Sequence, residues 1–443
     1  MRLALAVLCH LLPQQPPPPQ PIVIDVAGTF GNISFQSIRA AMERAQQVVN
    51  ISGASAVVFL RAGSHTVDMA GGNLFDISGA VPAAGQRLIV AGAGMYDTTL
   101  VTRTHNNDVI HAHPGHGRSH DPMWRRVSFE NMTFAREGQT TTQGRLLAAD
   151  EHGIELEISE GFPQLDEVMV NMPAKPSLWF RRYVVAANAS GEPRLVTDRY
   201  NNAYWKPRIN QQVSFACCNT SNATCQHSAS AWVCPAVERL PGSNRKWRLS
   251  VKKWPTNETQ RYQEALRDPS QRIAIKVKHG GQAYHLQQGD DVAFLNVRWL
   301  GHSRGAVIDT SNVLFRNTRV DRLPPPAVGS EVPLLASNAG GPQILGNSQP
   351  VFNLTVVNHT STATGDDSLA LFNVRTGLIA GCHIKDAFGR GIVMCSSSAV
   401  QVSGNELARN PLFWVNASSY AQCLCTDGHI SPKGVPQCVY PKY

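Results

Sequence analysis

The chain has 443 residues, 42% of them hydrophobic, so it can bury a large core as one elongated domain or as two to three compact ones. Only 16% are charged and 7% aromatic, whereas glycine occurs 35 times, and this profile favours a turn-rich β protein over a helical one. The net charge of +8 favours acidic partners, but the basic residues are scattered, which argues against a nucleic-acid partner.

The N-terminus resembles a secretion signal. Arg2 precedes an apolar run from Leu3 to Leu12, which suits the core of a signal peptide and is too short to span a bilayer. No other stretch approaches transmembrane length. Residues 1–20 are therefore predicted to be a signal peptide with a proline-rich lead, on a secreted, extracellular protein that has no membrane span.

The number of glycosylation sequons supports a eukaryotic secretory route. Roughly four Asn-X-Ser/Thr triplets would occur by chance at this Ser/Thr content. Asn131 and Asn358 also fit turns that follow a strand. The chain has ten such triplets, headed by Asn32, Asn50, Asn131, Asn188, Asn219, Asn222, Asn257, Asn353, Asn358 and Asn416.

The cysteines favour disulfides over zinc. Four lie within residues 217–234 and three within 423–438, and neither cluster has the two paired C-x₂₋₄-C units of a zinc site. Disulfides in surface loops are predicted instead, as in an oxidising compartment. With Cys382 and Cys395, nine cysteines follow the predicted signal, so at least one is unpaired or intermolecular.

The first predicted elements are a strand and a helix. Asp25–Gly28 and then Phe35–Ala45 indicate an opening strand and a short amphipathic helix, which would cover otherwise open strand edges. Apolar strands follow at 57–60 and 88–90.

A histidine-rich stretch comes next. Alternate residues of a strand face the same side, so a His-x-His pair projects two imidazoles together. No carboxylate or cysteine pattern accompanies the stretch, so we expect an exposed loop and predict no metal and no cofactor. The stretch contains His105, His111, His113, His116 and His120.

A weak repeat sets the fold. Val127–Phe134 has apolar residues at positions one, three and eight and asparagine at position five. Later copies have the fifth position at 296, 317, 358, 381 and 404, so that the steps are 21, 41, 23 and 23 residues. A step near 22 is one coil of three short strands, and it predicts an all-β, right-handed parallel β-helix. The step of 41 is one coil enlarged by the loop at Pro324–Pro326, or two coils.

The segment 138–280 breaks this period. It alternates instead, as in Ile154–Ile158, and it predicts an inserted β-rich, cysteine-containing subdomain. The predicted organisation is then N-terminal coils with a capping helix at 21–137, the insertion at 138–280, coils with the functional groove at 281–412, and a cysteine-containing tail at 413–443.

The strongest chemical signal is the pair Asp366 and Asp367 after Gly365. Two adjacent carboxylates repel each other, which raises one pKa and tends to mark a site. Glycoside hydrolysis needs one protonated carboxyl and one carboxylate beside the scissile bond. A solvated turn is the alternative, because the same tripeptide recurs at Gly289–Asp291 without special context.

Several motifs resemble the bacterial α-1,3-galactosidase family of glycoside hydrolases and, more remotely, the polygalacturonases and other pectin lyase-like proteins. The similarity is patchy over residues 22–410. It implies a β-helix interrupted by a small β-barrel. The motifs are Val127–Phe134, Thr142–Arg145, Glu160–Pro163, the run from Arg319 through Ser337–Gly341, and Gly365–Asp367.

The resemblance implies a catalytic cluster of an aspartate pair and a third aspartate one coil earlier. Asp366 and Asp367 match the pair, but the third position holds Gly340. Candidates for the missing carboxylate are Asp386, Glu406 and Glu331. Arg390, between two glycines, lies near the Gly-His-Gly position of polygalacturonases and is a candidate for binding an anionic sugar.

Three functions remain open. The first is a secreted, galactosidase-like glycoside hydrolase that uses Asp366 and Asp367 on an oligo- or polysaccharide, with an acidic one favoured by the net charge. The second is a non-catalytic carbohydrate-binding or structural β-helix that has lost the carboxylate at Gly340. The third is a polysaccharide lyase with Lys385 or Arg390 as the basic group.

Overall fold

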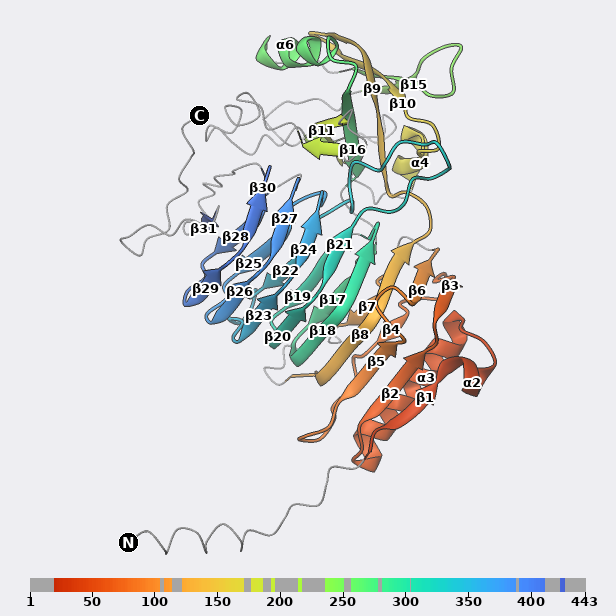
Figure 1. Ribbon diagram of the computed structural model, residues 1–443, viewed down its shortest axis with the longest axis vertical. Helices are drawn as coiled ribbons and strands as arrows, with labels where there is room; N and C mark the ends of the chain where they lie inside the picture. The colour runs from red at the N-terminus through yellow and green to blue at the C-terminus, as the bar shows by residue number, and fades with distance from the viewer. Residues whose placement is uncertain are drawn as a thin grey trace, which may run out of the picture.

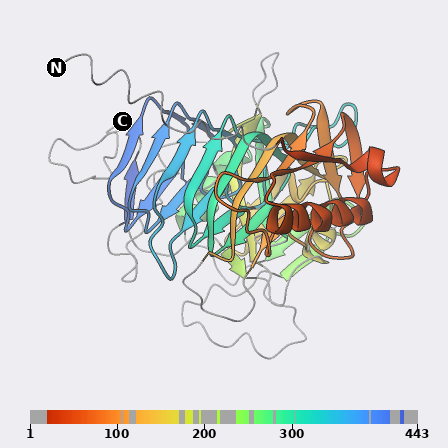
Figure 2. The ribbon, with the colours of Figure 1, turned by 90° about the horizontal axis from the view of Figure 1, so that it is seen from below.

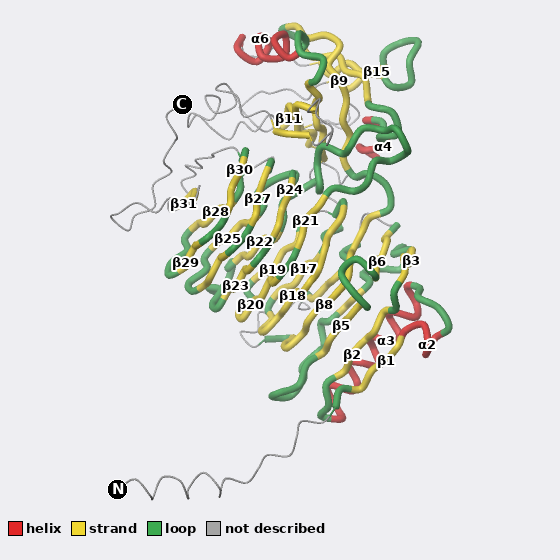
Figure 3. Tube along the Cα trace, viewed as in Figure 1, coloured by secondary structure: helices red, strands yellow, loops and turns green. Residues whose placement is uncertain are grey.

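The computed structural model describes twelve segments of the chain, shown as coloured ribbon and tube in Figures 1 and 3. The predicted signal peptide, most of the clustered cysteines, three of the five histidines of the histidine-rich stretch and four of the ten sequons lie outside them. The segments are 20–103, 107–113, 122–170, 177–185, 193–195, 214–216, 236–250, 256–277, 281–302, 304–387, 390–410 and 423–426.

Most described strands belong to two long sheets, which we call sheet A and sheet B. Sheet A contains β1 (Ile22–Asp25), β2 (Ala56–Leu60), β3 (Gly63–Val67), β5 (Leu88–Gly92), β6 (Thr98–Thr102), β8 (Trp124–Arg136), β18 (Gly289–Leu300), β20 (Ser311–Arg316), β21 (Arg319–Asp321), β23 (Leu354–Val357), β24 (Thr360–Thr362), β26 (Gly377–Ala380), β27 (His383–Lys385), β29 (Val400–Ser403) and β30 (Glu406–Ala408). Sheet B contains β4 (Phe75–Asp76), β7 (Ile110–Ala112), β17 (Tyr284–Gln287), β19 (Gly305–Ile308), β22 (Pro342–Leu345), β25 (Leu369–Phe372), β28 (Ile392–Cys395) and β31 (Cys423–Thr426).

Each strand pairs in parallel with its equivalent in the next coil, apart from β31, which pairs antiparallel with β28. A coil contributes one strand to sheet B and up to two to sheet A. This is the predicted right-handed parallel β-helix. Val313 lies opposite Leu354, so the step of 41 residues is one enlarged coil.

The corner within sheet A explains the repeat. Its residues have left-handed φ angles between 53° and 62°, which asparagine and glycine tolerate best. The asparagine amides also bond from coil to coil. Asn296 Nδ2 donates to Asn131 Oδ1 at 2.9 Å, and Asn358 Nδ2 donates to Asn317 Oδ1 at 2.8 Å. The predicted equivalence of 296, 317, 358, 381 and 404 is confirmed.

The core of the solenoid is a stack of apolar side chains between the sheets. Phe294 stacks on Phe129 at 5.6 Å and on Phe315 at 4.9 Å between ring centroids, so the same core position is aromatic in three successive coils. Such offset pairs add about 0.5–1.5 kcal/mol each beyond their burial. The core holds the coils in register and thereby fixes which residues face outward.

The expected helix is α3 (Phe35–Gln47), at the N-terminal end of the solenoid (Figure 2). The Ser34 hydroxyl caps it by accepting the Ser37 N–H. Ile38, Ala41 and Met42 bury one face in the solenoid core. A short helix, α2 (Val26–Phe30), precedes α3, and a π-helical turn (Val48–Ser52) follows it.

The insertion forms an antiparallel sheet, sheet C, beyond the ends to which the arrows of β24 and β27 point (Figure 1). Ile154, Leu156 and Trp247 are among its core residues. Its strands are β9 (Thr141–Asp150), β10 (Gly153–Ile158), β11 (Ser177–Val185), β12 (Pro193–Leu195), β13 (Ser214–Ala216), β14 (Ala236–Arg239), β15 (Lys246–Ser250) and β16 (Gln271–Val277), with helices α4 (Leu165–Val170) and α6 (Thr256–Ala265).

Three sequon asparagines belong to the coil-to-coil ladders. Asn131 and Asn358 lie at the corner described above, and Asn353 Nδ2 donates to Asn312 Oδ1 at 2.9 Å. Glycosylation at these positions stays a prediction, as does every predicted disulfide. Cys382 is buried and has a free thiol. No helix in the described part of the chain is long and apolar enough to cross a membrane.

Candidate functional site

Polar side chains follow the outer face of sheet B from coil to coil. His111 lies opposite His285 in register, and the same outward column continues through Ala306 to Gln343 and Ala370. Further polar residues stand just before the strands, at the turn that enters sheet B. We call the set the polar row: Asp108, His111, Gln282, His285, Arg304, Gln343, Asp366, Asp367 and Arg390.

Asp367 is held by Arg390 from the next coil. Asp367 Oδ1 accepts the Arg390 backbone N–H at 2.9 Å and its Nε–H at 2.8 Å, and Oδ2 accepts Nη2–H at 2.8 Å. The side chains are only 8% and 15% exposed. Because both carboxylate oxygens are engaged, Asp367 serves as an anchor between coils, and Arg390 is committed to it.

Asp366, the preceding residue in the chain, is 9% exposed. The outer column beside it is covered rather than open, since Ala370 and Val393 are 1% and 0% exposed. The aspartate pair therefore stands beside an apolar, covered part of the face.

Gly340 lies where the backbone of two coils comes together. A Cβ on this residue would lie 2.6 Å from the Asp367 carbonyl oxygen and 3.0 Å from Gln343 Nε2. The neighbouring Gly341 N–H donates to that same carbonyl at 2.9 Å. No side chain fits at 340 unless the backbone shifts, so the departure from the resembled pattern is built into the local structure.

The other carboxylates proposed from the sequence have different partners. Asp386 is fully buried and accepts two hydrogen bonds from Arg409, each 2.7 Å long. Glu406 is exposed and lies 3.0 Å from His383 Nδ1 on the neighbouring strand. Both carboxylates are thus engaged with basic side chains of the adjacent coil, and a role for either in place of the carboxylate absent at Gly340 stays a prediction.

Glu331 joins the enlarged coil to the insertion. It accepts hydrogen bonds from Arg272 at 2.7 Å, Ser159 at 2.7 Å and Gln143 at 3.1 Å. Burial acts to raise the pKa of Glu331, but these hydrogen bonds outweigh it and lower the pKa below the ordinary value. Glu331 is thus an ionised anchor for sheet C.

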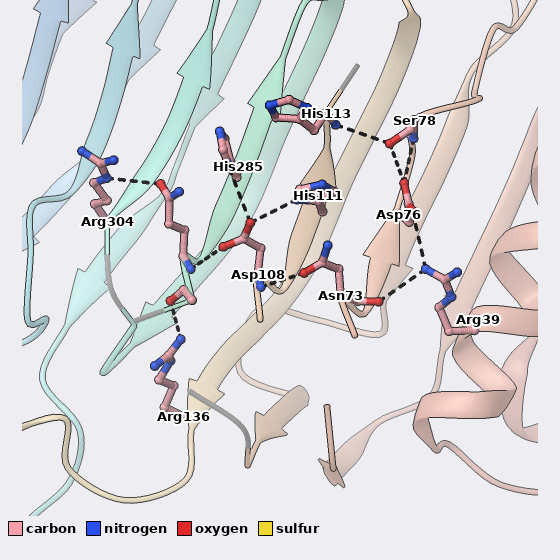
Figure 4. Close-up of polar contacts among 12 residues, drawn as sticks. Arg39, Asn73, Asp76, Ser78, Asp108, His111, His113, Arg136, His285 and Arg304 are labelled. Carbon is pink, nitrogen blue, oxygen red and sulfur yellow. Dashed lines mark hydrogen bonds and ion pairs between the residues drawn. The ribbon is translucent and has the colours of Figure 1, made fainter. Parts of the chain in front are cut away.

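The opposite end of the polar row is a cluster of one carboxylate and two imidazoles (Figure 4). Asp108 Oδ2 lies 3.0 Å from His111 Nδ1 and 3.5 Å from His285 Nδ1. Asp108 Oδ1 accepts the Gln282 N–H at 2.6 Å. Burial acts to raise the pKa of Asp108, but the hydrogen bonds from His111, His285 and Gln282 outweigh it and hold the pKa well below its usual range.

A third imidazole adjoins this cluster. His113 lies two residues after His111, on the same face, and their rings stack with centroids 6.2 Å apart. The His113 ring also approaches His285 edge to face at 5.8 Å. The imidazoles at 111 and 285 are about a fifth exposed, so the cluster is open to solvent.

Arg304 connects the two ends. Its Nε donates to Gln282 Oε1 and its Nη1 to Gln343 Oε1, both at 3.2 Å. Burial lowers the pKa of Arg304, while the charges of Asp366 and Asp108 act in the opposite direction. A guanidinium that feels both carboxylates and is fixed by two amides is preorganised to bind an anion or a hydroxyl-rich ligand.

Sequence reasoning placed the aspartates but missed Asp108, Gln282, His285 and Arg304. The expectation that no carboxylate accompanies the histidines was wrong, because Asp108 lies beside two of their rings. One signal was present: Ile110–Ala112 and Tyr284–Leu286 are both apolar-His-apolar, and they pair in register. They are separated by the insertion, which hides their relation. His105, His116 and His120 lie outside the described residues.

Comparisons with known proteins find no matching family model and no matching curated protein. Among solved structures, a family 28 exopolygalacturonase from Yersinia enterocolitica aligns with 88% of this chain at 13% identity and a TM-score of 0.33. The chain spans 57% of that enzyme's length.

Two further structures align over similar shares. The A-module of a mannuronan C-5 epimerase from Azotobacter vinelandii aligns with 88% of this chain and 79% of its own, at 10% identity and a TM-score of 0.32. A structure described as a glycoside hydrolase aligns with 89% of this chain over 97% of its own length, at 8% identity and a TM-score of 0.25. At these values the comparisons assign no activity to the chain.

Proposed function

We propose that this protein binds an acidic carbohydrate chain along the polar row. The observation that carries the proposal is the part of the row from His111 through His285 and Arg304 to Gln343: hydrogen-bonding side chains stand on successive coils of one sheet face. Equivalent strands of neighbouring coils are about 4.8 Å apart, so an extended ligand can contact several coils in turn. The net charge of +8 and the central position of Arg304 favour an anionic sugar, such as a uronate or a sulfated unit.

Binding explains the geometry better than hydrolysis does. Hydrolysis by the usual route needs two carboxyl groups with separate roles. Of the three positions implied by the resemblance, Gly340 has no carboxyl and both oxygens of Asp367 are engaged by Arg390. That leaves Asp366, one carboxyl where the chemistry requires two.

Hydrolysis is the second candidate, on the strength of one observation. Asp366 acts electrostatically on Arg304, so it belongs to the same row as the proposed ligand contacts. In that case Asp366 is the residue on which turnover depends. The lyase alternative loses one basic group, because Arg390 is bound to Asp367.

The test is binding of uronate-containing and neutral oligosaccharides to the full-length protein, by calorimetry. Arg304→Ala should weaken binding of the acidic ligand about 10- to 100-fold, the usual range for a charge-assisted hydrogen bond. Arg316→Ala is the matched control, since Arg316 is exposed on sheet A and its loss removes the same charge. Equal effects of the two variants would refute binding at the row.

The same samples separate binding from hydrolysis. We expect the wild-type protein to bind without releasing new reducing ends. Release that Asp366→Asn abolishes while binding persists would instead establish the second candidate, because asparagine keeps the shape of aspartate but cannot pass a proton.

A further inference from the structure

The cluster at the N-terminal end of the polar row has the geometry of a metal site. Asp108, His111 and His285 are a group whose potential ligand atoms all lie within 4.8 Å of one another. They come from two neighbouring parallel strands and the turn before one of them, so the solenoid core fixes their spacing. We propose that these three residues bind one Zn²⁺ ion at this end of the polar row, and the metal titrations below need no carbohydrate ligand.

The spacing between the ligand atoms fits this ion. Zinc binds histidine nitrogen and carboxylate oxygen at about 2.0–2.2 Å, so two ligands at a tetrahedral angle lie about 3.3–3.5 Å apart. The observed separations from Asp108 Oδ2 are 3.0 Å to His111 Nδ1 and 3.5 Å to His285 Nδ1. All three ligand atoms lie within 4.8 Å of one another, so side-chain rotations can bring them around one ion.

The carboxylate is oriented for this role. Asp108 Oδ1 is bound by the Gln282 N–H, and the Asp108 N–H donates to Asn73 Oδ1 at 2.9 Å. The first contact orients the carboxylate with Oδ2 toward the imidazoles, as outer-shell hydrogen bonds do for metal ligands, and the second fixes the Asp108 backbone.

Arg136 and Arg304 interact electrostatically with Asp108, and their positive charges disfavour the binding of a cation beside it. The Arg136 side chain, however, donates to His302 Nδ1 and to the Gly281 carbonyl, and the Arg304 side chain to Gln282 and Gln343. Both guanidinium groups are thus directed at acceptors other than Oδ2. The arginines limit the affinity but leave the ligand atoms accessible.

Three protein ligands leave one position of a tetrahedral site for water or for the adjacent His113. Two imidazoles and one carboxylate favour zinc and similar transition metals over calcium, which prefers six to eight oxygen ligands. The site thus discriminates by donor type, and this property can be measured directly.

The experiment titrates Zn²⁺ into chelator-treated, full-length protein by calorimetry and follows Co²⁺, as a spectroscopic probe, by its visible absorption. We expect one site per chain with micromolar or tighter affinity for Zn²⁺ and no comparable site for Ca²⁺. His285→Ala should weaken binding by at least 100-fold and remove the Co²⁺ spectrum, because even outer-shell partners are worth about 10–100-fold.

His383→Ala is the matched control, because His383 also lies 3.0 Å from a carboxylate, Glu406, but has no second histidine in its cluster in the described part of the chain. It should leave binding unchanged. His111→Ala gives an independent second variant, and circular dichroism verifies that each variant is folded.

Two results would overturn the proposal. One is wild-type affinity no better than millimolar, which would make the cluster a hydrogen-bonded carboxylate with two imidazoles. The other is tight binding that survives His285→Ala and His111→Ala but is lost when His105, His116 and His120 are replaced.

Discussion

Each end of the polar row holds a carboxylate beside basic side chains, but the two ends differ in the kind of partner and in its exposure. At one end Asp367 is neutralised by an arginine that fills both of its oxygens, and the pair is almost inaccessible. At the other end Asp108 faces two imidazoles, which are partly exposed to solvent. A carboxylate that is fully satisfied by a guanidinium contributes structure, whereas one that shares its oxygen with histidines keeps a capacity for chemistry.

The largest expected effect comes from breaking the ion pair between Asp367 and Arg390. Arg390→Ala leaves the Asp367 carboxylate buried without its partner, and breaking a buried pair costs about 3–5 kcal/mol. Urea denaturation should show this loss in the free energy of unfolding, whereas His285→Ala should cost far less. Equal losses would show that the two ends do not differ in structural role.

Gly340→Ala tests whether the missing carboxylate is excluded by packing. The added Cβ meets the Asp367 carbonyl oxygen at 2.6 Å, and overpacking of this kind costs about 1–3 kcal/mol. Gly79→Ala is the control, because the nearest atom to its Cβ is the flexible Gln46 Oε1 at 3.4 Å. Thermal melts of both variants give the comparison. A Gly340→Ala protein as stable as Gly79→Ala would show that this backbone yields easily.

The loss of stability at acidic pH tests the Asp108 end of the polar row. The pKa of Asp108 is lower in the folded protein than the ~3.9 of an unfolded chain. Its contribution is therefore complete above about pH 4 and is lost as the pH falls below that value. Between about pH 4 and pH 2 the free energy of unfolding should fall by about 1–3 kcal/mol less in Asp108→Asn than in wild type. That difference is the worth of hydrogen bonds to a charged group. Parallel curves for the two proteins would contradict the shift.

The smallest expected effect concerns an exposed pair with the same spacing along the chain. His383 and Glu406 are 23 residues apart, like Asp367 and Arg390, but their side chains are 57% and 73% exposed. Exposed pairs contribute little to stability. Urea denaturation of Glu406→Gln should match wild type within error, and a measurable loss would mean that coil-to-coil pairing matters apart from burial.

The repeat allowed the solenoid to be predicted because it records a backbone requirement: left-handed residues at one corner. The pairing of Asp367 with Arg390 was implicit in the same step, since 23 residues is one coil. The cluster at Asp108 was not predictable in this way. Gln282, whose N–H orients Asp108, lies 174 residues later, and only the folded register shows that the two segments are consecutive coils.

The asparagine ladder has a consequence for how the chain folds. Asn317 and Asn296 are 21 residues apart, whereas Asn296 and Asn131 are 165 apart. An eightfold longer loop is three doublings, and each doubling adds about 0.6 kcal/mol to the entropy cost of closure. We therefore expect docking of β18 on β8 to be the slower, nonlocal step and the coils after β18 to assemble through local contacts. If sheet C forms first, it brings its own ends together and shortens the loop that must close.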